Sequence, residues 1–296
     1  MARAFAVPFD VTRPPLLRAT VVRRSDHRVD LVLVAHHLIL DGWSTPILIE
    51  RLLAALLAGT DPAEVRADGW LTYRKYLRHI RSQPLDIARR AWAAHLSGLT
   101  VARLAPAGPT PAEPAPVPAG PRPVMPVPLS RTSAATLIER ARAAGLTLST
   151  VLAGAWATVL ARFLGRADVV LGTTVAGRTV DLPGIEGMIG LLSTTVPVRV
   201  HLRPGVPMAV QLAQLQLERA RLQDHDTLDL PEIEAAAGVV GPLFDSLLVV
   251  ENYPLTTDSA DEVTVGEVGN RGGTHYPITV TALPGADLRL VVEPEV

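Results

Sequence analysis

A proline-rich stretch divides the sequence into two parts. Residues 105–128 contain ten of the chain's 26 prolines. Each proline lacks a backbone N–H and has a fixed φ, so this density excludes both helix and central strand. We therefore predict an extended linker over residues 105–128. It separates an N-terminal lobe, residues 1–104, from a C-terminal lobe, residues 129–296.

Helix-like and strand-like segments alternate on both sides of the linker. At 296 residues and 48% hydrophobic content the chain can bury a large core, and wholesale disorder is excluded. The mixture predicts an α/β or α+β fold. Expected strands cover residues 16–22, 29–36, 168–175, 196–202, 244–253, 263–268, 277–283 and 288–292. Expected helices cover residues 46–58, a segment after Asp68, 86–96, 133–144, 149–164 and 207–224, with Ser133 capping the helix over 133–144 and a glycine-rich loop over 181–190.

Composition excludes several functional classes. The net charge of −1 gives no electrostatic reason to expect nucleic acid or an anionic membrane as a partner. The absence of cysteine excludes disulfides, thiolate metal sites and a cysteine nucleophile. The start of the chain does not resemble a signal peptide, and no apolar run reaches membrane-spanning length. We therefore expect a cytoplasmic protein.

The segment from His36 to Ser44 joins a predicted strand to a predicted helix. The preceding residues, 30–35, are apolar and β-branched, as in a buried strand. After the segment, Thr45 is expected to cap a helix that begins at Pro46, and Gly59 is expected to end it. Two histidines and an aspartate therefore lie at a junction of the kind that often carries chemistry.

These residues argue against a metal site and against a serine nucleophile. If the strand continues through His36 and His37, their side chains point in opposite directions, and one metal cannot easily bind both. Asp41 is the only other nearby ligand, whereas zinc needs three or four. No Gly-x-Ser-x-Gly motif is present. Ser44 is better explained by the start of the helix.

Two interpretations of the histidines are left. One histidine acts on bound substrates as a base, an acid or a hydrogen-bond partner, while Asp41 orients the loop. The following helix then directs its positive end and free N–H groups at the site, which suits acyl transfer through a tetrahedral intermediate. Alternatively, both histidines are ordinary hydrogen-bonded core residues.

The segment from His36 to Gly42 resembles the His-His-x-x-x-Asp-Gly motif of the condensation domains of nonribosomal peptide synthetases. Other segments resemble that family in the same order along the chain. They are Phe9-Asp10, Pro15-Leu16-Leu17-Arg18-Ala19, residues 168–178, residues 182–186 with Met188-Ile189-Gly190, residues 243–247, residues 250–254 and residues 274–277.

The resemblance implies a fold like that of chloramphenicol acetyltransferase, with two lobes and an active site in a tunnel between them. It also implies substrates held as thioesters on the 4'-phosphopantetheine arms of donor and acceptor carrier domains, beside an adenylation domain. The α-amine of the acceptor attacks the donor thioester and forms an amide. No residues recognisably bind ATP or a diffusible cofactor directly.

The resemblance also assigns roles to individual residues. His37 positions or deprotonates the amine, and the N–H of Gly42 helps to hold the oxyanion. His36 and Asp41 are structural, with Asp41 paired to Arg178. Much of the rate comes from holding two tethered reactants together. Candidate tunnel-lining residues are Trp43, Ser44, Asn252 and His275.

The sequence departs from the family pattern in two respects. The family's segment before Phe9 and its closing helix after residue 296 are missing, so we expect an incomplete N-terminal lobe. Residues 191–195 replace a Phe-Ile-Asn-type sequence. The alternatives are a sister activity on the same fold, namely epimerisation, ester formation or a free-standing acyltransferase, and a truncated, non-catalytic remnant or docking module. A heterocyclising relative would carry aspartates in place of the histidines.

Overall fold

The computed structural model describes residues 7–57, 59, 68–105, 123–252, 266, 273–285 and 287–294. The chain forms two compact units. The first comprises Met1–His79, Leu182–Leu192 and Tyr253–Val263, and the second comprises Ile80–Asp181, Ser193–Asn252 and Thr264–Val296. Most of the predicted linker, 105–128, lies outside the described residues, so the lobe boundary there stays a prediction.

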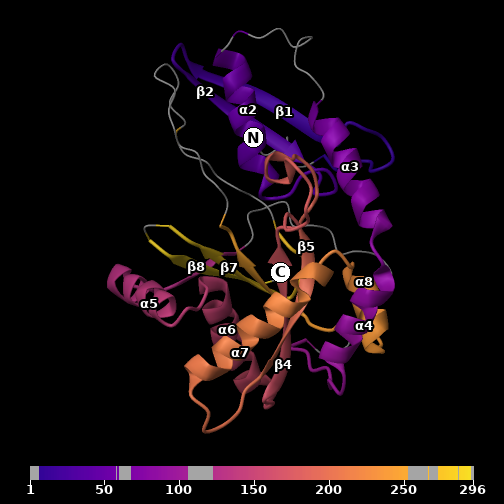
Figure 1. Ribbon diagram of the computed structural model, residues 1–296. Helices are drawn as coiled ribbons and strands as arrows, with labels where there is room; N and C mark the ends of the chain where they lie inside the picture. The colour runs from indigo at the N-terminus through magenta and orange to yellow at the C-terminus, as the bar shows by residue number, and fades with distance from the viewer. Residues whose placement is uncertain are drawn as a thin grey trace. The chain divides into compact units, whose positions relative to one another are not determined.

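The first unit contains an antiparallel hairpin and two helices (Figure 1). Strand β1 (Leu17–Ser25) pairs with β2 (Arg28–Ala35), from Leu17 opposite Ala35 to Ser25 opposite Arg28. The hairpin is longer than expected, because Arg23 and Ser25, which follow the first predicted strand, pair with Val29 and Arg28. Helices α2 (Ser44–Leu57) and α3 (Asp68–Ser82) follow, and α3 runs across the boundary between the units.

Helix α2 starts differently from our prediction. Thr45 is not the cap, because the helix already includes Ser44, whose amide donates to the Asp41 carboxylate at 2.8 Å. The Thr45 hydroxyl instead donates to the carbonyl of Asp41 at 3.2 Å. The predicted stop at Gly59 is confirmed: its φ is +58°, and its amide donates to the carbonyl of Leu56.

The second unit is built on a six-stranded mixed sheet in the order β3-β8-β7-β6-β4-β5. Strands β4, β6 and β7 are parallel to one another, and the remaining pairs are antiparallel. The strand predicted over 263–268 lies outside the described residues apart from Gly266. The bounds are β3 (Met125–Val127), β4 (Asp168–Val175), β5 (Thr194–His201), β6 (Ser246–Val250), β7 (Ile278–Leu283) and β8 (Arg289–Pro294).

Strand β3 comes from the end of the proline-rich stretch and was not predicted. It contains Pro126, which a central strand would not tolerate. Because β3 pairs only with β8, it is an edge strand, and its three residues are exposed.

Helices cover both faces of this sheet. Side chains of β4 alternate between two hydrophobic clusters, with Val169 and Leu171 in one and Val170 in the other. The first cluster includes residues of α5 (Arg131–Ala143), α6 (Leu148–Leu164) and α7 (Met208–Leu222). The second includes residues of α4 (Leu85–Leu96) and α8 (Leu230–Ala237), which pack against each other, and α4 also contacts the short turn η2 (Gln223–His225).

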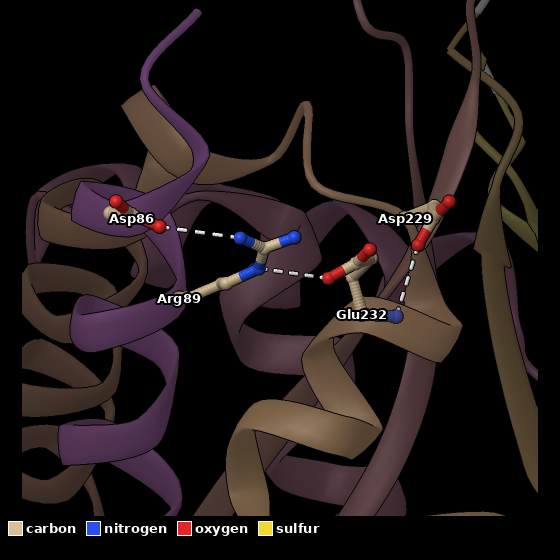
Figure 2. Close-up of polar contacts among 4 residues, drawn as sticks. All are labelled: Asp86, Arg89, Asp229 and Glu232. Carbon is tan, nitrogen blue, oxygen red and sulfur yellow. Dashed lines mark hydrogen bonds and ion pairs between the residues drawn. The ribbon is translucent and has the colours of Figure 1, made fainter.

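Two helix starts in this unit correct the prediction. Helix α5 is capped by Ser130, whose hydroxyl accepts the amide of Ser133, so Ser133 lies inside the helix. Helix α8 was not predicted at all. Asp229 caps it by accepting the amide of Glu232, as Figure 2 shows, and Gly238 ends it with φ +67°.

None of the described helices is by itself long and apolar enough to span a membrane. Helices α5 and α6 reach that length and composition only as a pair, bent by 111°.

Candidate functional site

His36 is held in place directly after β2. Its amide donates to the carbonyl of Leu16 at 2.9 Å, which extends the hairpin ladder by one bond. Its Nδ1 accepts the amide of Leu38 at 3.1 Å, and its carbonyl accepts the amide of Ile39. Because Nδ1 accepts a hydrogen bond, the neutral ring carries its proton on Nε2. His36 therefore shapes the turn over residues 37–39.

His37 opens that turn, and its side chain is exposed. Its imidazole has no hydrogen-bond partner within the described residues. The strand ends at Ala35, so the two histidines do not alternate across a continuing strand. The environments of the two histidines nevertheless differ, because His36 is half-buried whereas His37 is exposed. The geometry leaves both nitrogens of His37 available to a bound substrate.

Asp41 connects the junction to a segment about 150 residues away in the sequence. It is 2% exposed. One carboxylate oxygen accepts the Ser44 amide at 2.8 Å and the Ser44 hydroxyl at 2.6 Å, and the other accepts the Leu192 amide at 3.0 Å. The Asp41 amide donates to the carbonyl of Gly190 at 3.2 Å. Burial with three donors identifies Asp41 as a structural carboxylate.

Ser44 completes this network. Its hydroxyl donates its single proton to Asp41, at the shorter distance, and accepts the Gly190 amide at 3.1 Å. Ser44 is 0% exposed. The structure therefore corrects its predicted place in a tunnel wall: its side chain is enclosed in the scaffold and presents no accessible surface.

Three further side chains hold residues 182–192 in the first unit. Trp43 donates its indole N–H to the carbonyl of Glu186 at 3.0 Å. Arg51 donates to the carbonyl of Gly187 at 2.7 Å, and the Tyr73 hydroxyl donates to that of Leu191 at 3.1 Å. The predicted glycine-rich loop contains one short helical turn, η1 (Ile185–Gly187). Donors from α2, α3 and the residue before α2 thus bind a series of loop carbonyls.

Gly190 is required by its contact with Tyr73. A Cβ at position 190 would lie 2.4 Å from two atoms of the Tyr73 ring, closer than side chains approach. Burial raises the pKa of Tyr73, and the charge of Asp41 raises it further. The phenol therefore stays neutral and donates to the loop carbonyl.

The other candidate residues belong to the second unit. Arg178 is buried at 8% exposure and donates to the carbonyl of Ala176 at 3.0 Å. It follows the carboxyl end of β4, and Asn252, which is exposed, follows the carboxyl end of the parallel strand β6. These two residues therefore lie beyond the same end of the sheet. The predicted pair of Asp41 with Arg178 stays a prediction.

His275 lies beyond the opposite end of the sheet from Asn252. It precedes β7, which runs parallel to β6 with Ile278 opposite Ser246. These two ends of the sheet are therefore about 13 Å apart, which is the length of β6 at about 3.3 Å per residue. His275 is exposed and stacks on Tyr276, with ring centroids 4.4 Å apart. The sheet does not bring His275 and Asn252 together.

Reasoning from the sequence did not find Tyr73 or Arg51, because neither belongs to a motif. A signal for Gly190 existed, since it ends the Met188-Ile189-Gly190 segment. Within the described residues, no group of three or more His, Asp or Glu side chains could hold a metal ion.

Comparison with known proteins identifies the family. The model of the condensation domain family matches residues 1–293. The chain therefore belongs to the condensation domain family, as the ordered motifs predicted.

Curated relatives include the vanchrobactin synthetase VabF of Vibrio anguillarum, which is 37% identical over 94% of this chain. The chondramide synthase cmdD of Chondromyces crocatus is 32% identical over 92% of the chain. The chain spans only 10% and 7%, respectively, of the length of these two relatives.

Solved structures share the fold. The first condensation domain of the CDA synthetase superposes with a TM-score of 0.76 at 22% identity, covering 99% of this chain and 65% of that one. The X-domain from teicoplanin biosynthesis gives 0.74 at 21% identity, covering 97% of this chain and 68% of that one. The predicted chloramphenicol acetyltransferase-like fold is thereby confirmed.

Proposed function

We propose that this condensation domain forms an amide bond between two carrier-bound substrates. The donor is an acyl or peptidyl thioester, and the acceptor is the α-amine of an aminoacyl thioester. Each is held on the 4'-phosphopantetheine arm of a peptidyl carrier domain, next to an adenylation domain. The observation that carries the proposal is the exposed imidazole of His37, presented by a turn whose two flanks are fixed by His36 and Asp41.

The reaction needs only groups that such a site supplies. The amine nitrogen attacks the thioester carbonyl carbon, and a tetrahedral oxyanion forms. Collapse breaks the C–S bond, and the donor arm leaves as a thiol after taking the proton lost by the amine. His37 orients the amine and transfers this proton, and the N–H of Gly42 donates to the oxyanion.

The direction of the following helix supports this assignment. Helix α2 begins two residues after Gly42, so its positive end lies at the junction and favours negative charge on oxygen. The buried Asp41 carboxylate is already satisfied by three donors, so it fixes the backbone of the junction and leaves proton transfer to His37. Holding both tethered substrates in place supplies much of the rate.

Mass spectrometry of the carriers tests the proposal. The chain is mixed with a donor carrier and an acceptor carrier, each loaded with one aminoacyl group, and the acceptor arm is analysed. A dipeptidyl thioester on the acceptor supports amide formation. Inversion of the donor without transfer, or ester formation with a hydroxyl acceptor, would support a sister activity instead. A folded chain that gives none of these products contradicts a catalytic role and leaves a docking module.

A further inference from the structure

The Phe9-Asp10 segment contacts the first histidine of the motif. The Phe9 ring lies edge to face with the His36 ring, with centroids 6.2 Å apart and an interplanar angle of 84°. The guanidinium of Arg18 lies over the Phe9 ring, with its central carbon 4.0 Å from the ring centroid. Phe9 thus touches both a cation and His36.

The hairpin register explains why these groups meet. Arg18 on β1 is opposite Val34 on β2, and the amide of His36 donates to Leu16. Residues two apart on a strand share a face, so Arg18 and His36 are diagonal neighbours on one face of the hairpin. The Phe9 ring spans this diagonal.

Both ends of this contact are themselves fixed. Asp10 accepts the amide of Thr12 at 3.0 Å and its hydroxyl at 2.6 Å, which forms the turn that holds the Phe9 backbone. Arg18 donates to the carbonyl of Val7. The Nε of Arg18 is buried without a hydrogen-bond partner among the described residues. An unsatisfied buried N–H is unfavourable, so the contact of the guanidinium with the Phe9 ring has to offset this cost.

We infer that Phe9, supported by Arg18, is a positioning residue for the catalytic turn. Its ring holds the His36 ring in the plane where Nδ1 accepts the Leu38 amide. That hydrogen bond sets the turn over 37–39, which in turn sets the direction of His37. The kinetic part of this inference rests on the proposed function, whereas the structural part does not.

Hydrogen exchange of the Leu38 amide in the chain tests the contact without any substrate. In Phe9→Leu the ring contact is lost, and exchange of this amide should accelerate about fivefold, the effect of losing one hydrogen bond. Phe163→Leu is the matched control, because Phe163 is 79% exposed on α6 in the other unit. It should leave Leu38 unchanged. Phe9→Tyr keeps the ring and should behave like the wild type.

The kinetic readout uses the carrier assay. In Phe9→Leu we expect kcat to fall about tenfold with unchanged KM for both carriers, since misdirection of His37 affects the reacting geometry. Phe9→Tyr should restore kcat. Equal Leu38 exchange in Phe9→Leu and the wild type would overturn the inference.

A second variant tests the inference if Phe9→Leu does not fold. Arg18→Met removes the cation over the ring and keeps the length of the side chain, so Leu38 exchange should accelerate about twofold, because the ring loses one of its two contacts. An unchanged rate there would also overturn the inference. If the exchange results hold but the wild type forms no dipeptidyl carrier, the proposed function fails and the positioning contact stands.

Discussion

Two polar networks connect segments that are far apart in the sequence, and they differ in burial. In the first unit, Asp41 joins the junction to residues 190–192, and it is 2% exposed. In the second unit, Arg89 of α4 donates to Glu232 of α8 at 2.9 Å and to Asp86 at 3.2 Å, as Figure 2 shows. The Arg89 and Glu232 side chains are each 40% exposed.

This difference in burial decides which network determines structure. Water can replace the partners of Arg89 and Glu232, so this ion pair contributes little to stability. Water cannot reach the amides of Ser44 and Leu192 that donate to Asp41, so their loss leaves buried groups unsatisfied. Helices α4 and α8 stay together through apolar contacts around Trp92 and Ile233, both 0% exposed. The junction depends instead on the Asp41 carboxylate.

Removal of Asp41 should have the largest effect on stability. In Asp41→Ala the Ser44 and Leu192 amides lose their acceptor, and we expect the free energy of unfolding to fall by about 3 kcal/mol or more. Urea unfolding measures this change, with Asp86→Ala as the control, since that side chain is 78% exposed. An equal loss of unfolding free energy in Asp41→Ala and Asp86→Ala would contradict the distinction between the two networks.

Gly190→Ala should have the second-largest effect on stability. The added methyl group meets the Tyr73 ring, and overpacking of this kind costs about 1–3 kcal/mol. Gly187→Ala is the matched control, because a Cβ there would lie 3.7 Å from Arg51 and so tests the same loop without a clash. The two alanine variants can be compared by thermal unfolding. A fully stable Gly190→Ala chain would show that the Tyr73 contact adapts easily.

Tyr73→Phe should have a smaller effect that depends on pH. Loss of the hydrogen bond to Leu191 costs about 1 kcal/mol. Because burial raises the pKa of Tyr73 above its ordinary value of 10.0, the folded state holds the phenolic proton more tightly than the unfolded state. This contribution is present below about pH 10 and is lost as the pH rises through the folded pKa. Urea unfolding between about pH 9 and pH 11 should therefore show a shallower decline in Tyr73→Phe; equal slopes contradict this account.

Glu232→Gln should have the smallest effect. The hydrogen bond from Arg89 lowers the pKa of Glu232, so any contribution is present above the ordinary pKa and is lost as the pH falls through the lowered value. Because the side chains are exposed, we expect unfolding near neutral pH to match the wild type and carrier assays to be unaffected. A destabilisation as large as that of Asp41→Ala would contradict the contrast between the two networks.

Sequence patterns predicted the helices and strands better than the contacts between them. Strand β4 was predicted with the bounds that it has, because an apolar run between Gly165 and Gly177 leaves little freedom. Helix α8 was missed because eight residues are too few for a periodic signal. Its ends were nevertheless marked by Asp229, Glu232 and Gly238.

The site was predicted only in part, because local motifs are visible in the sequence and long-range contacts are not. The junction is local, so its motif was visible, and the role of Asp41 in orienting the loop follows from its position before a helix. Its hydrogen bonds with Gly190 and Leu192 depend on tertiary folding across about 150 residues, which no local pattern encodes. Ser44 was misplaced because a hydroxyl at a helix start suits either a scaffold or a surface until its burial is known.

The rate of dipeptidyl-carrier formation by His37→Ala, compared with the wild type, tests the central claim most directly. If the junction presents His37 to the amine, the wild type forms the product and His37→Ala slows it about a hundredfold, within the usual range for loss of an acid or base. Some activity persists because the tethered substrates are still held together. Equal rates from two folded proteins would contradict the assignment of His37.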